Sequence, residues 1–189
     1  DAISVKFLRN KSIEIGVHIA DVGHYVKSKS AIDQEAFLRA FSVYFPGKVI
    51  PMLPEKLSNI LCSLRPNEDK LSFSVLIKMN NSYKIESTWI GKGVIRSNKR
   101  FSYQEAEKII VNKKGEFYKE LNTLNLIAKK LKLNRINGGS INFERTDIEF
   151  VLNDQGEPES IVTKKSLDAH KLVEEFMLLS NKIVAEKLT

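Results

Sequence analysis

The histidines and their acidic neighbours are the first residues whose spacing could support chemistry. His18, His24 and His170 form neither an HExxH pattern nor a Cys/His pattern, which argues against a zinc site. His18 and Asp21 lie three residues apart at a predicted strand end. A shared metal ion and a structural hydrogen bond are both open interpretations, and the hydrogen bond is favoured because buried polar groups are usually bonded.

The remaining reactive patterns are weak. Gly91-Lys92-Gly93 lies inside a strand-like pattern that leads to no helix, so it does not predict a phosphate-binding loop, and no GxSxG sequence occurs. Cys62 is the single cysteine, which excludes an internal disulfide, and no His/Asp partner for a thiol nucleophile is apparent. Spacing alone therefore specifies no reaction.

The charge of the chain is compatible with a polyanionic partner. The 189 residues carry a net charge of +7, which suits RNA, although a solvated lysine-rich surface explains the charge equally well. No apolar run approaches the roughly 20 residues of a membrane span and no signal peptide is visible, so we expect a cytoplasmic protein without membrane contact. Because the sequence begins at Asp1, we expect it to be part of a longer chain.

Hydrophobic periodicity predicts the elements that must position any site. Alternating patterns predict strands, and spacings of three and four residues predict helices. A proline-rich segment, residues 42–66, predicts a strand followed by an ordered loop. The predicted strands are 13–20, 71–79, 83–95, 148–152 and 159–164, and the predicted helices are 31–41, 102–110, 116–133 and a last one from 168. Hairpin-like strand pairs with helices between them predict an α+β fold with a mixed, mainly antiparallel sheet and surrounding α-helices.

Several irregular segments occur together in a recognisable order. They are IGVHIADVGHYV (15–26), SVY (42–44), VIPMLPEKLSN (49–59), LCSL (61–64), PNEDKLSFS (66–74), VIRS (94–97), FSY (101–103), GSINF (139–143) and DAHKLVEEFMLLSN (168–181). With them, the whole chain resembles the N-terminal half of the catalytic domain of the ribonuclease II/ribonuclease R (RNB-domain) family. KSL at 165–167 departs from the family pattern, in which an arginine and an asparagine are common there.

The resemblance implies a fold and a function. Residues 1–189 would be a partial RNB domain, truncated at both ends, whose sheet is part of a barrel-like sheet. The intact enzyme would be a monomeric 3′-to-5′ exoribonuclease that hydrolyses single-stranded RNA to 5′-nucleotides, and this piece alone would be inactive. Half a domain would leave sheet edges exposed, so we expect a tendency to self-associate. The alternatives are a non-catalytic RNA-binding module of a degradation assembly and a domain that contacts other proteins of that assembly.

The resemblance also implies a magnesium cofactor. Residues 1–5, DAISV, match the end of the family's aspartate cluster, so Asp1 would be its last member, both a catalytic residue and a metal ligand. One carboxylate is too little charge for a tight Mg²⁺ site, so the other aspartates would lie upstream. A frayed terminal residue is the alternative for Asp1.

Three further residues correspond to RNA contacts of the family. Tyr44 and Phe143 would stack on bases near the 3′ end, and Glu175 would accept hydrogen bonds from the terminal ribose. Ordinary core aromatics and a surface glutamate are the alternatives. We expect the three side chains to share one cleft with Asp1.

A basic cluster lies at a predicted strand end. Arg96 and Arg100, with Lys92 and Lys99, are candidates for binding phosphates. A solvated strand edge guarded by lysines is an equally good interpretation of the same residues.

Overall fold

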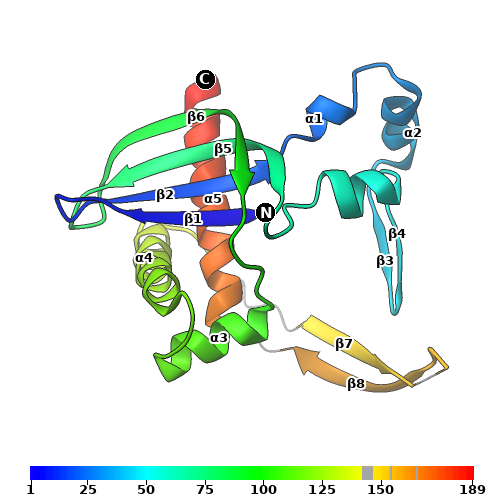
Figure 1. Ribbon diagram of the computed structural model, residues 1–189. Coiled ribbons are helices and arrows are strands. Elements are labelled where there is room, and N and C mark those ends of the chain that lie inside the picture. The colour runs from blue at the N-terminus through cyan, green and yellow to red at the C-terminus, as the bar shows by residue number, and fades with distance from the viewer. Residues whose placement is uncertain (142–146, 154, 165) are drawn as a thin grey trace.

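A four-stranded sheet forms the centre of the molecule (Figure 1). The computed structural model describes the chain except for residues 142–146, 154 and 165. The strands follow the order β1-β2-β5-β6, and each neighbouring pair is antiparallel. Their bounds are β1 Ala2–Phe7, β2 Ile13–Ala20, β5 Asp69–Met79 and β6 Ile85–Arg96.

Three helices pack below and behind this sheet, and two small hairpins lie apart from it (Figure 1). The helices are α3 Tyr103–Asn112, α4 Tyr118–Asn137 and α5 Asp168–Leu188. The hairpins are β3 Val43–Phe45 with β4 Lys48–Ile50, and β7 Asp147–Leu152 with β8 Pro158–Lys164. Between β2 and β5 the chain also forms α1 Val22–Tyr25, α2 Ala31–Arg39 and a π-helix, η1 Lys56–Leu61.

This architecture confirms the predicted α+β class with mainly antiparallel strands. An isolated parallel bridge between Pro66 and Ser97 adds to the antiparallel pairs. The strands of the described residues form three separate sheets and no closed barrel. Within the same residues, no helix is long and apolar enough to cross a membrane.

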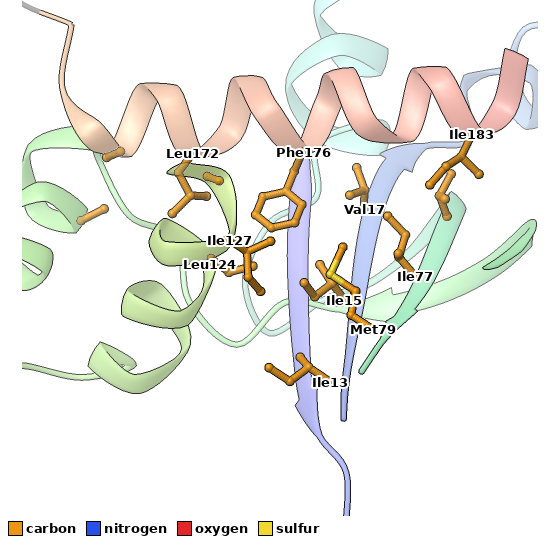
Figure 2. Close-up of a cluster of buried hydrophobic side chains, with 14 of the residues drawn as sticks. Ile13, Ile15, Val17, Ile77, Met79, Leu124, Ile127, Leu172, Phe176 and Ile183 are labelled. Atoms are coloured by element: carbon orange, nitrogen blue, oxygen red, sulfur yellow. The ribbon is translucent and has the colours of Figure 1, made fainter. Parts of the chain in front are cut away.

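The core lies between the central sheet and α5. Alternation along β2 turns Ile15 and Val17 toward the helices, and their partners on β5, Ile77 and Val75, face the same way. Phe176 of α5, fully buried, projects into the middle of this face, where α4 also contributes side chains (Figure 2). The predicted helix from residue 168 is confirmed, and it carries an apolar stripe whose members are fully or partly buried: Leu172, Phe176, Leu179 and Ile183.

The start of α3, with Ser102 as its N-cap, agrees with the helix predicted at 102–110. Ser102 Oγ accepts a hydrogen bond from the Glu105 backbone N–H, and Glu105 accepts one from the Ser102 backbone N–H at 2.7 Å. These reciprocal bonds are a capping box, which satisfies amide donors that have no partner within the helix. They fix the chain direction immediately after the basic residues that follow β6.

Candidate functional site

A cavity of about 600 Å³ opens beside the edge strand β1. Its wall combines the first residues of the chain with residues 95–103, which run from the end of β6 to the start of α3. Its floor is apolar and comes from three helices: Ala106, Leu121, Leu124, Ala169, Leu172, Val173 and Met177. The cavity thus lies where the sheet edge and the helices meet.

Asp1, Arg96 and Arg100 all line this cavity. Asp1 is exposed and directly precedes β1, whose first residue Ala2 pairs with His18 of β2. The antiparallel register of β1 therefore places the Asp1 carboxyl group at one end of the central sheet. Asp1 is thus brought to one site with two arginines about half the chain away in sequence, and Glu120 also lines this site.

The basic cluster is partly neutralised. Arg96 donates to the Asn67 carbonyl at 3.0 Å and lies 3.7 Å from Asp69. Lys99 pairs with Glu116 at 3.0 Å. Arg96 keeps 65% of its side chain exposed, and Arg100 is also exposed, so both guanidinium groups remain accessible to a phosphate.

His18 and Asp21 serve the structure of the sheet. His18 Nε2 lies 2.8 Å from Ser4 Oγ, and its Nδ1 lies 2.8 Å from Ser74 Oγ, so the ring links β1, β2 and β5. A Cβ at Gly16 would overlap both His18 and Ser4, so a side chain at this position would displace the ring from its hydrogen bonds. Asp21 pairs with Lys92 at 2.9 Å, and this contact holds the pKa of its carboxyl below the ordinary value. The structural hydrogen bond favoured for His18 is confirmed.

The burial of His18 predicts a pH-dependent stability. Burial lowers the pKa of this imidazole from its ordinary value of 6.5. Below pH 6.5 the unfolded chain therefore binds a proton that the folded chain does not, and the free energy of unfolding falls until the folded-state pKa is passed. Hydrogen exchange of the amides in β2 and β5, measured across this range, should report the loss. His18→Gln should remove this component, and an equal pH slope in that variant would contradict the assignment.

Tyr44 lies on the β3–β4 hairpin, opposite Val49. Its side chain is 76% exposed, so the alternative that it is a core aromatic is wrong. The hairpin stands apart from the central sheet (Figure 1), and Tyr44 does not line the cavity that holds Asp1. The tyrosine is therefore free to stack on a ligand, at a different place on the surface.

Glu175 is buried in α5, so the alternative of a surface glutamate is wrong. Arg135, in the last turn of α4, donates to both of its oxygens, with Nη2–Oε1 at 2.6 Å and Nε–Oε2 at 3.3 Å. Accepting these bonds, Glu175 raises the pKa of Arg135 above its usual value. The sequence did not single out Arg135, although its place just before the Gly138-Gly139 helix end was a visible signal.

The expected common cleft is only partly present. The cavity brings Asp1, Arg96 and Arg100 together, whereas Glu175 and Tyr44 are not among its lining residues. Glu175 is nevertheless in the same helix as the lining residues Val173 and Met177. Phe143 lies outside the described residues.

An α+β domain with Asp1 and two arginines at one cavity is suited to an anionic ligand. Comparison with known proteins gives the family to which the chain belongs. The family model described as the RNB domain matches residues 1–189, so the chain belongs to the RNB family. It is 42% identical over 186 residues to Ribonuclease R of Chlamydia pneumoniae, covering 98% of this chain and 28% of that protein.

Two solved structures are also similar. RNase R of Mycoplasma genitalium, in complex with ribose-methylated single-stranded RNA, superposes with a TM-score of 0.90 at 32% identity, covering 98% of this chain and 30% of the other. Yeast Ssd1, described as a pseudonuclease, superposes with a TM-score of 0.77 at 25% identity, covering 98% and 23%. The chain thus spans less than a third of the length of each of these three relatives.

Proposed function

We propose that the protein containing this chain is a 3′-to-5′ exoribonuclease that hydrolyses single-stranded RNA to 5′-nucleotides. The observation that carries the proposal is the RNB-family match over residues 1–189. The convergence of Asp1 with Arg96 and Arg100 at one cavity supports it. The RNase R of Mycoplasma genitalium, captured with single-stranded RNA, supports that class of substrate. We assign the activity to the whole protein, a cytoplasmic monomer, and expect the isolated chain to be inactive and to self-associate.

Each site residue has a distinct role in this proposal. Arg96 and Arg100 bind backbone phosphates, because guanidinium groups match phosphate oxygens in charge and geometry. Tyr44 and Phe143 stack on bases, an interaction that every base supports and that suits degradation of any sequence. Glu175 accepts hydrogen bonds from the terminal ribose, which selects RNA over DNA.

Magnesium is part of the proposal, with Asp1 as one ligand. The described residues contain no group of three or more acidic, histidine or cysteine side chains that could hold a metal ion. One carboxylate does not match the several oxygen ligands that Mg²⁺ takes, so the described residues by themselves do not fit the ion. In this proposal the other ligands come from outside the chain, and measurement of Mg²⁺ binding by the full-length protein and by residues 1–189 separately tests this.

The experiment that tests the reaction follows the products of the full-length protein. An RNA oligonucleotide labelled at its 5′ end should shorten by one nucleotide at a time, and 5′-mononucleotides should accumulate. The same oligonucleotide made of DNA serves as the control for ribose recognition. Release of internal fragments, or of nucleotides from the 5′ end, would refute the proposal.

Tyr44→Ala should change the length of the final product without abolishing cleavage. The exposed ring contributes stacking of roughly 1–3 kcal/mol, which matters most when the remaining RNA is short and makes few other contacts. Gel separation of the limit products measures the effect, and Phe37→Ala, another exposed aromatic at 85%, is the matched control. An unchanged set of products would contradict the stacking role.

A non-catalytic RNA-binding module is the second candidate. The similarity to Ssd1, a pseudonuclease, favours it, because the same fold occurs there in a protein described as lacking nuclease function. Tight, salt-sensitive RNA binding by the full-length protein, without any shortening of the RNA, would favour this candidate over the enzyme.

A further inference from the structure

The contact between Arg135 and Glu175 links α4 to α5. Neither residue lines the cavity that holds Asp1. Glu175 is 3% exposed, whereas 30% of the Arg135 side chain reaches solvent. A ligand can therefore approach the pair from the arginine side. Within the described residues, no buried side-chain polar atom lacks a partner, so the carboxylate is held in a satisfied and fixed arrangement.

Arg135 is bound on more than one side. Its Nη1 donates to Ser140 Oγ at 3.0 Å, and its Nη2 lies 4.0 Å from Glu174. Ser140 follows the Gly138-Gly139 turn at the end of α4. One guanidinium thus fixes the buried acid and the start of the segment that follows α4.

The two bonds leave the carboxylate able to accept others. An ionised carboxylate has about four acceptor positions, and Arg135 occupies one on each oxygen. The remaining positions can accept from two neighbouring hydroxyl groups, which is the donor pattern of a ribose at a 3′ end. A rigid planar guanidinium fixes the orientation of those positions, which an ammonium group would not.

We propose that Arg135 is a positioning residue that holds Glu175 in the orientation needed to recognise the terminal ribose. The proposal rests on the exoribonuclease function proposed above. It predicts that loss of Arg135 impairs ribose recognition in the same way as loss of Glu175 itself.

The chain provides a matched control for a purely structural role. Lys129 pairs with Asp168 at 2.6 Å, and this contact also joins α4 to α5. If ion pairs between these helices serve stability alone, Lys129→Gln and Arg135→Gln should have the same effect on the substrate preference. If Arg135 positions Glu175, the two variants should differ.

The test compares two RNA oligonucleotides with the full-length protein, one all-ribo and one with a single 2′-deoxynucleotide at the 3′ end. The ratio of kcat/KM for release of the first nucleotide measures ribose preference. Arg135→Gln and Glu175→Gln should each reduce the wild-type ratio by about tenfold or more, mainly through KM for the all-ribo substrate. The double variant should reduce it no further, because the two residues act as one unit.

The other variants separate positioning from charge and from stability. Arg135→Lys should give an intermediate ratio, and Lys129→Gln should keep the wild-type ratio. Thermal unfolding identifies variants that do not fold; if Arg135→Gln is among them, Arg135→Lys and Ser140→Ala, which removes one bond of the guanidinium, provide the comparison.

Three results would count against these ideas in different ways. A wild-type ratio in folded Arg135 variants, with a reduced ratio in Glu175→Gln, would overturn the positioning role. An unchanged ratio in Glu175→Gln would overturn the role of Glu175 in ribose recognition, and with it the role of Arg135 in positioning Glu175. A wild-type protein that shortens neither oligonucleotide would instead refute the exoribonuclease function.

Discussion

Asp1→Asn in the full-length protein is expected to abolish RNA hydrolysis and to leave RNA binding intact. The substitution keeps the size of the side chain at the cavity edge and removes its negative charge. If Asp1 binds the catalytic cation, loss of that charge should lower turnover by about 10²–10³-fold or more, the order found when a group that stabilises the transition state is removed. Binding should persist, because Arg96, Arg100 and Tyr44 are unchanged.

Two measurements on the same preparations check this expectation. Fluorescence anisotropy of labelled single-stranded RNA gives the affinity at fixed salt, and a product ladder gives the rate. Glu186→Gln is the control, since Glu186 is an exposed acid on α5 whose nearest cation is Lys182 at 3.8 Å. Turnover near the wild-type rate in Asp1→Asn would remove Asp1 from the catalytic site and leave the metal proposal without a ligand in this chain.

Regular periodicity allowed most of the fold to be predicted. The strand predicted at 13–20 has the same bounds as β2, because Ile13, Ile15 and Val17 alternate with residues of the other face. The start of the helix predicted at 102–110 agrees with α3 for a similar reason: the two capping-box bonds between Ser102 and Glu105 are local in sequence.

The segment between α2 and β5 was only partly predictable. Residues 42–66 gave a strand and an ordered loop, and the structure adds a second strand, β4, and the π-helix η1. The tertiary contacts that stabilise η1 are not visible in local spacing: Lys70, from β5, donates to the Ile60 carbonyl at 2.8 Å. A contact from another element thus contributes to the local conformation.

Glu175 illustrates the limit for the site. Its spacing of three residues after Leu172 and its position next to Phe176 place it at the edge of the buried stripe, which was a readable signal. Its partner lies 40 residues earlier, on another helix, and no sequence pattern joins the two. The grouping of Asp1 with Arg96 and Arg100 likewise depends on the strand order of the sheet.

Phe176→Ala is expected to cause the largest loss of stability of any substitution considered. The ring is fully buried between α5 and the sheet, against Ile15, Val17 and Ile127 (Figure 2). Its removal loses the transfer free energy of the ring and leaves a cavity among branched side chains that can collapse only partly. The expected cost is about 3–5 kcal/mol, a large fraction of the stability of a typical domain.

Leu178→Ala separates this effect from a general weakening of α5. Leu178 belongs to the same helix and is 42% exposed, so its truncation should change the free energy of unfolding much less, by roughly 0.5 kcal/mol. Hydrogen exchange of the β2 amides in the full-length protein measures both variants, because these amides exchange only when the core opens. Equal protection in Phe176→Ala and Leu178→Ala would mean that α5 does not hold the sheet in place. The proposal that α5 holds the floor of the cavity against the sheet would then be wrong.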